Sequence, residues 1–173
     1  MSLYRYVATK DELLALMVDA AFQTPPAAPG PRAGWRAALS RWAREHLAVL
    51  RRHPWVVRVP LSGPPITPNQ VVWFERGLVT LRNTGLTEGE KVSVLLLVNG
   101  FVRNEALLRA DLQMAAGAGS TVADATSSYG KQLSRLVAPR RFPAISAVIA
   151  AGVFDGADDP DADFNFGLER ILD

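Results

Sequence analysis

The amino-acid sequence predicts an all-α protein. Apolar residues recur at helical spacing in each long segment, and no segment has the alternating pattern of a β-strand. Stretches rich in proline and glycine, such as residues 24–33 and 62–68, separate these segments. The longest segment, from Glu88 to Met114, is apolar on two opposite faces. Because such a helix must be buried on both faces, we expect it to pack against its own core and against a partner subunit.

The composition fits a folded domain of this kind. The chain has 173 residues, of which 49% are hydrophobic and 21% are charged, as in globular proteins. A net charge of +2 is too small for a basic surface over the whole chain, so any contact with DNA must be local. There is no cysteine, no signal peptide, and no apolar run long enough to span a bilayer. We therefore expect a cytoplasmic protein that does not contact a membrane.

The first two predicted helices cover residues 10–23 and 34–52. Thr9 and Glu12 have the spacing of a capping box, which marks the start of the first helix at Lys10. The proline-rich linker cannot continue that helix. The second helix is predicted from a narrow apolar stripe, which consists of Trp35, Leu39, Trp42, His46, Val49 and Leu50.

Prolines bound the next two predicted helices. Pro54 stops the preceding helix and begins a short one over residues 55–61. Thr67 is predicted to cap the following helix, which has Pro68 at its first position and ends near Thr84. Gly85 follows as a helix terminator.

The second half of the chain is predicted to hold four more helices. The long helix begins at Glu88 after a second capping box, formed by Thr87 and Glu90. Further amphipathic helices are predicted over residues 121–138, within residues 139–152, and from about residue 163 to the last residue. An acidic linker precedes the last helix, which is a favourable position for negative charge.

Two segments resemble a known family. Residues 2–14, S-L-Y-R-Y-V-A-T-K-D-E-L-L, resemble the end of the recognition helix and the start of the fourth helix in TetR-family transcriptional regulators. Residues 163–173, D-F-N-F-G-L-E-R-I-L-D, resemble the segment that opens the final helix in an actinobacterial-type branch of that family. The turns F-P-A-I and R-R-H-P-W, at residues 142–145 and 51–55, are similar to turns of the same branch. The family's first two helices and most of its third are missing from this sequence.

The resemblance implies a domain organisation and a function. Residues 1–9 would be the end of a helix-turn-helix domain, and residues 10–173 a ligand-binding domain that dimerises through a four-helix bundle. The protein would be a homodimeric, ligand-responsive transcriptional regulator, expected to be a repressor that a small-molecule inducer releases from operator DNA. The DNA-contacting positions are Ser2, Tyr4, Arg5, Tyr6 and Lys10, side chains that can donate hydrogen bonds to phosphates. The alternative is a helical module that binds a small molecule or dimerises without binding DNA.

Polar side chains within apolar stripes predict a ligand pocket. Asn99 and Arg103 share a face of the long helix with Leu96, and a buried guanidinium needs a partner. That partner could be Glu105, Asp111, a carboxylate on another helix, or an anionic or carbonyl group of a small molecule. His46 is either a core residue or a ligand contact. The tryptophans, including Trp35, could line the same pocket. The candidate pocket residues are Met17, Trp42, His46, Trp55, Trp73, Phe74, Leu96, Asn99 and Arg103.

The opposite face of the long helix is predicted to form the dimer interface. Gly100 lies within this helix at a cost of about 1 kcal/mol relative to alanine, which a close helix crossing would explain. The interface candidates in this helix are Val94, Val98, Gly100, Phe101, Glu105 and Leu108. The final helix is expected to contribute Phe166, Leu168 and Ile171.

The sequence predicts neither catalysis nor a cofactor. His46 and His53 have no carboxylate placed to orient them, and no nucleophile motif is present. Asp159, Asp161 and Asp163 alternate as in a calcium loop, but the glycine and the final glutamate of such a loop are missing. We therefore expect no metal site.

Overall fold

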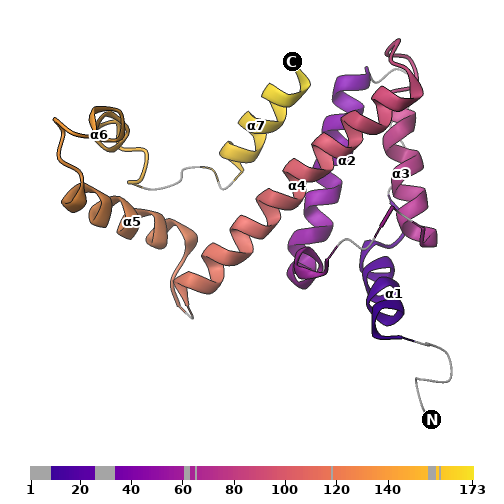
Figure 1. Cartoon of the computed structure of the whole chain (residues 1–173), viewed down its shortest axis with the longest axis horizontal. Coiled ribbons are helices and arrows are strands. Elements are labelled where there is room, and N and C mark those ends of the chain that lie inside the picture. Colours follow the sequence, from indigo (N-terminus) through magenta and orange to yellow (C-terminus); the bar gives the residue numbers. More distant parts are fainter. Residues whose placement is uncertain are drawn as a thin grey trace. The chain divides into compact units, whose positions relative to one another are not determined.

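The computed structural model describes residues 9–25, 34–60, 63–64, 66–117, 119–155, 159 and 161–173. Over these residues the chain is helical and contains no β-strand, which confirms the predicted all-α class (Figure 1). The elements are α1 (Lys10–Phe22), α2 (Trp35–Arg52), the 3-10 helix η2 (Pro54–Arg58), α3 (Pro68–Thr80), α4 (Glu88–Ala116), α5 (Val122–Leu136), α6 (Pro143–Ala150) and α7 (Ala162–Leu172).

The chain folds as two compact units. Unit 1 comprises Met1–Leu107 and Leu168–Asp173, and unit 2 comprises Leu108–Gly167. The sequence assigns residues 10–173 to one domain, and its helical periodicity carries no sign of this division. Both α4 and α7 extend across a boundary between the two units.

Three helix starts are fixed by residues close in sequence. The Thr9 hydroxyl accepts a hydrogen bond of 3.1 Å from the backbone N–H of Glu12. At α4, Glu90 accepts from the backbone N–H of Thr87 at 2.7 Å, while the Thr87 hydroxyl accepts from the N–H of Glu90 at 3.3 Å. Thr121 and Asp124 form the same reciprocal pair at α5. These local bonds satisfy N–H groups that the helix itself leaves unpaired.

The start of α3 differs from the prediction. Pro68 stands at the first position, but the Thr67 side chain makes no capping hydrogen bond. Instead, Oδ1 of Asp19, on α1, accepts from the backbone N–H groups of Asn69 at 2.9 Å and Gln70 at 3.2 Å. A carboxylate at the positive end of a helix stabilises it more than a hydroxyl does, which explains why the neighbouring helix supplies the cap.

Helices α2, α3 and the first part of α4 surround the core of unit 1. Helix α2 packs against α3, and α1 packs against α3 near its first turn (Figure 1). At Gly77, α3 lies close to both α4 and α2. A Cβ atom at this position would lie 2.9 Å from the Leu95 methyl carbons and 3.2 Å from the Trp42 ring. The most deeply buried large side chains of the unit are Leu39, Val49, Leu50, Val56, Leu81, Val98, Val102 and Leu168.

The core corrects two predicted interface residues. Val98 and Leu168 are both 0% exposed, so they pack inside the chain and present no surface to a partner. The inward stripe of α4 runs through Leu95, Val98 and Val102, between the two faces that the sequence predicts. Trp35 also differs from expectation, since it is 42% exposed at the first residue of α2.

A salt-bridge cluster joins the start of α2 to the end of α7. Nη2 of Arg36 lies 2.8 Å from a carboxylate oxygen of Glu169 and 2.7 Å from one of Asp173. Nη1 of Arg36 donates to the carbonyl oxygen of Leu172 at 2.7 Å. The hydrogen bonds from Arg36 lower the pKa of the Asp173 carboxyl. This cluster orders the last turn of the chain within unit 1.

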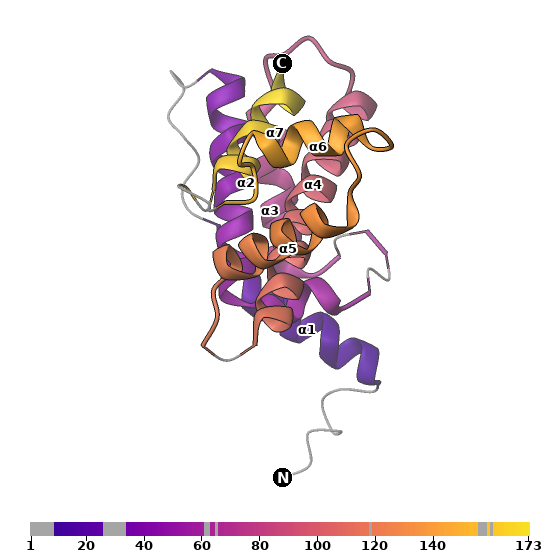
Figure 2. The same ribbon diagram turned by 90° about the vertical axis from the view of Figure 1, so that its left-hand side faces the viewer.

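Unit 2 contains α5 and α6 as neighbouring helices (Figure 2). The ring of Tyr129, on α5, lies 5.4 Å from that of Phe154, in the turn after α6, edge to face. Gly130 makes this contact possible, because a Cβ atom there would come within 2.6 Å of Phe154. None of the residues of α6 is buried, although its sequence, P-A-I-S-A-V-I-A, is almost wholly apolar.

Candidate functional site

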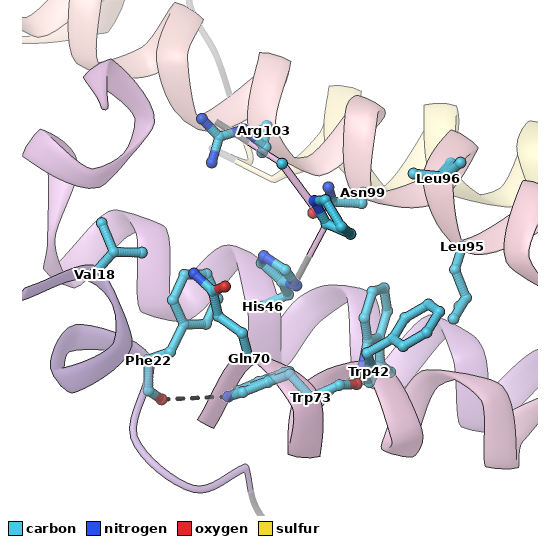
Figure 3. Close-up of a pocket in the computed structure, with 13 residues that line it drawn as sticks. Val18, Phe22, Trp42, His46, Gln70, Trp73, Leu95, Leu96, Asn99 and Arg103 are labelled. Carbon is cyan, nitrogen blue, oxygen red and sulfur yellow. Dashed lines mark hydrogen bonds between the residues drawn. The ribbon is translucent and has the colours of Figure 1, made fainter. Parts of the chain in front are cut away.

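A cavity of about 220 Å³ lies within unit 1. Helices α1, α2, α3 and α4 each contribute side chains to it, as does the segment at residues 63–64 (Figure 3). The lining residues are Val18, Phe22, Trp42, His46, Gly63, Pro64, Gln70, Trp73, Phe74, Leu95, Leu96, Asn99 and Arg103. Among these residues there is no carboxylate.

Aromatic rings form one wall of the cavity. Trp42 and His46 lie four residues apart on α2, so both project from the same face of that helix. The His46 ring is 5.2 Å from Trp42, 5.4 Å from Trp73 and 4.9 Å from Phe22, each edge to face. The Trp42 indole N–H donates to the carbonyl oxygen of Trp73 at 3.0 Å. The indole N–H of Trp73 likewise donates to the carbonyl oxygen of Gln23 at 3.0 Å. Because each indole is bound to a backbone carbonyl, the orientation of both rings is fixed.

One ring nitrogen of His46 is buried without a hydrogen-bond partner among the described residues. The side chain is 7% exposed, and its Nδ1 atom has no partner in the described part of the chain. Burial, and to a smaller degree the positive charge of Arg103, lowers the pKa of His46 to about 3. The imidazole is therefore neutral at physiological pH.

Arg103 brings a positive charge to the opposite wall. It projects from α4 one turn after Asn99, facing the His46 ring (Figure 3). Its Nη2 atom donates to the carbonyl oxygens of Val57 at 3.4 Å and Val59 at 3.5 Å. Burial lowers the pKa of the guanidinium. Among the described residues, the hydrogen bonds of Arg103 go to these two carbonyl oxygens.

The structure brings most of the predicted pocket residues to this cavity. Trp42, His46, Trp73, Phe74, Leu96, Asn99 and Arg103 all line it. Met17 and Trp55 do not, since they are 44% and 37% exposed and lie outside the lining. Val18 and Phe22 also line the cavity and were not predicted there, although they recur at helical spacing in the first helix. Gln70 lines it too, and the local sequence pattern carries no signal for it.

Helix α1 is fastened to the cavity by two sets of hydrogen bonds. Asp19, which is 8% exposed, caps α3 at Gln70, and the Gln70 side chain lines the cavity. The side-chain amide of Asn69 donates two hydrogen bonds to Asp19, one of 3.0 Å to the carboxylate and one of 3.1 Å to the backbone oxygen. Nε1 of Trp73 donates to the carbonyl oxygens of Phe22 at 3.3 Å and Gln23 at 3.0 Å. A displacement of the cavity wall at α3 must therefore move α1 or break these bonds.

The predicted DNA-contacting positions are less well defined. Ser2, Tyr4, Arg5 and Tyr6 lie outside the described residues. Lys10 is exposed at the first position of α1.

The predicted interface residues differ in exposure. Gly100, Leu108 and Phe166 are exposed, Leu108 by 51% and Phe166 by 70%. A second group is half-buried, namely Val94, Phe101, Glu105 and Ile171. Leu108 and Phe166 thus remain candidates for a contact with a partner subunit.

Two kinds of site are not found in the described residues. No group of histidine and acidic side chains there could hold a metal ion. No described helix is long and apolar enough to cross a membrane.

Comparison with known proteins gives consistent matches. A family model described as the tetracyclin repressor-like, C-terminal domain matches residues 28–173. The chain is 40% identical to the HTH-type transcriptional repressor DrrR1 of Streptomyces coeruleorubidus, over 100% of this chain and 63% of that protein. It is 30% identical to an HTH-type transcriptional regulator of Saccharopolyspora erythraea, over 58% of this chain and 43% of that protein. The chain thus spans less than two thirds of the length of either relative.

A solved structure is similar over almost the whole chain. ActR, a TetR family protein of Streptomyces coelicolor, has been solved in complex with (S)-DNPA and with actinorhodin. Each complex superposes with a TM-score of 0.75 at 27% identity, covering 98% of this chain and 77% of the other. The two curated relatives are named as transcriptional regulators, not as enzymes.

Proposed function

This chain belongs to the TetR family of transcriptional regulators, and on that premise we propose that it is the ligand-binding and dimer-forming part of a ligand-responsive regulator. Joined to a complete helix-turn-helix, it binds operator DNA, and a small molecule in the unit 1 cavity releases it. Residues 1–9 are assigned to the end of the recognition helix and residues 10–173 to the regulatory domain. As a DNA-binding repressor, the protein acts in the cytoplasm.

The observation that carries this proposal is the fastening of α1 to the cavity. Gln70 and Trp73 line the cavity, and both also bind α1 through hydrogen bonds. A ligand that displaces α3 therefore also pulls on α1, the helix that follows the DNA-contacting segment. The likeness to ActR, which binds (S)-DNPA and actinorhodin, supports the assignment of the cavity to a small molecule.

Release requires that the ligand bind the two states of the protein with different affinity. A ligand with equal affinity for the DNA-bound and free conformations shifts nothing, however tightly it binds. Coupling between two such sites typically amounts to about 1–3 kcal/mol. In this mechanism, the ligand favours a position of α1 that separates the two DNA-binding heads by the wrong distance for the operator.

Dimer formation is assigned to the exposed apolar surface of unit 2. The isoleucine and valine side chains of α6 remain accessible, with Ile145 39% and Val148 41% exposed. Leu136 at the end of α5 is 78% exposed. A second copy of the chain that buries this surface would form the four-helix bundle that the family resemblance implies.

The experiment that tests the DNA-binding proposal compares two proteins. One is this chain, and the other carries a complete helix-turn-helix ahead of residue 10. DNA fragments are selected from a random-sequence pool with the longer protein and measured by gel shift at several salt concentrations. We expect specific, salt-sensitive binding by the longer protein and weak or no binding by this chain. Equal binding by both would contradict the proposal, as would failure of the longer protein to select any sequence.

Sedimentation at micromolar concentration tests the dimer. The chain is expected to sediment as a dimer, and Val148→Glu to sediment as a monomer because a charge enters the apolar surface. Ser134→Glu, at an exposed polar position of α5, is the matched control and should remain dimeric. A monomeric unaltered chain would refute the dimer, and the result would favour a helical ligand-binding module without a DNA role.

A further inference from the structure

We infer that the unit 1 cavity selects a flat, two-ring aromatic acid whose carboxylate pairs with Arg103. This inference rests on the proposed function, since it names the class of ligand for the same cavity. Two features of the lining carry it: one cation with no acidic residue beside it in the lining, and aromatic walls around a limited volume.

The charge of the cavity favours an anion. Arg103 contributes a positive charge, His46 is neutral, and the lining residues Gln70 and Asn99 are neutral amides. No lining residue is acidic, and the hydrogen bonds of Arg103 to Val57 and Val59, at 3.4 and 3.5 Å, are longer than ordinary N–H···O bonds. A guanidinium has five N–H donors, so most of its capacity remains for a ligand.

A carboxylate is the ligand group that this arrangement lacks. Carboxylates match the planar guanidinium with two parallel hydrogen bonds, which are stronger than bonds between neutral groups. A neutral ligand would leave the half-buried charge without a counter-ion. A cationic ligand would add a second positive charge to a site that already lowers the pKa of its histidine.

The walls and the volume determine the shape of the ligand. Trp42, Trp73 and Phe22 present ring surfaces whose orientations are held by backbone hydrogen bonds and mutual edge contacts. Flat rings pack well against such walls. An apolar cavity of about 150 Å³ accommodates benzene. The volume of about 220 Å³ therefore corresponds to two fused rings.

The test is isothermal titration calorimetry on this chain with three probes of one size. They are 2-naphthoate, the neutral 2-naphthamide and the cationic 2-naphthylmethylammonium. We expect 2-naphthoate to bind about tenfold or more tightly than 2-naphthamide, because bonds to charged groups are the stronger ones, and we expect no binding of the cation.

Variants test whether Arg103 is the anchor. Arg103→Gln should reduce the affinity for 2-naphthoate to that for 2-naphthamide, while Arg103→Lys should retain part of the preference. Arg82→Gln removes the same charge from an exposed position outside the cavity, and should bind as the unaltered chain does. Circular dichroism of each variant checks that it folds.

Several results would overturn the inference. They are binding of the amide or the cation as tight as that of 2-naphthoate, full affinity for 2-naphthoate in Arg103→Gln, and no binding of 2-naphthoate at millimolar concentration. Operator binding by the protein that carries a complete helix-turn-helix is measured without any probe. If that binding is observed and 2-naphthoate fails, only the ligand class is wrong. If 2-naphthoate binds as expected and no operator is found, the regulatory function is wrong.

Discussion

Replacement of His46 by phenylalanine should remove a pH dependence from the stability of unit 1. The imidazole has a folded-state pKa of about 3, against 6.5 for an exposed histidine. Between these values the unfolded chain binds a proton at this side chain and the folded chain does not. The stability from the neutral, buried form is therefore complete above about pH 6.5 and is lost as the pH falls from there towards 3.

The size of the effect follows from the difference between the two pKa values. One pKa unit corresponds to about 1.4 kcal/mol, so by about pH 4.5 the loss is about 2 to 3 kcal/mol. Phenylalanine cannot take up a proton, and it fits among the rings of Phe22, Trp42 and Trp73. Because Nδ1 of His46 has no partner among the described residues, the variant loses no hydrogen bond to them at that atom. At neutral pH it should therefore be at least as stable as the unaltered chain.

Urea unfolding at about pH 7.5 and pH 4.5 measures this difference. Tryptophan fluorescence is the readout, because Trp42 and Trp73 pack against His46 and report on unit 1. The free energy of unfolding of the unaltered chain should fall by about 2 to 3 kcal/mol more than that of His46→Phe. His53→Phe, at the other histidine, is the control and should retain the larger fall. An equal fall in His46→Phe and the unaltered chain would refute the reasoning.

Two matched pairs of substitutions test the packing of unit 1, each by urea unfolding. Gly77→Ala should destabilise by about 1–3 kcal/mol because its Cβ atom would lie 2.9 Å from Leu95. Gly100→Ala, with nothing within 4 Å, should stabilise α4 by about 0.5–1 kcal/mol, and destabilisation there would contradict the open position. Asp19→Ala should cost about 2 kcal/mol through loss of the α3 cap. The exposed Asp11→Ala should change stability by only about 0.5 kcal/mol, and an equal effect of both would rule out the cap.

Local chemistry determined most of the helices. The start of α1 at Lys10 and of α4 at Glu88 follows from hydroxyl and carboxylate caps three residues apart, whose partners lie in the same turn. The stripe of α2 places Trp42 and His46 on one face by the helical period alone, and both line the cavity. Such features were predictable because each depends only on residues that are close in sequence.

Tertiary contacts decided which face of each helix is buried, which the helical period alone does not determine. The sequence shows which residues of α4 share a face, but the face that becomes the core depends on where α2 and α3 lie. For that reason Val98 is buried, although it was predicted at the dimer interface. The cap of α3 comes from Asp19, 50 residues before Asn69, and no local pattern announces it.

By itself, the sequence determined the all-α class, the helix starts and most of the polar and aromatic residues of the candidate site. Only the tertiary structure decided that Arg103 shares the cavity with no acidic lining residue and that Gln70 and Trp73 link the cavity to α1. The physical reason is that side-chain partners across helices are set by three-dimensional packing, whereas capping and periodicity act within a few residues of the chain.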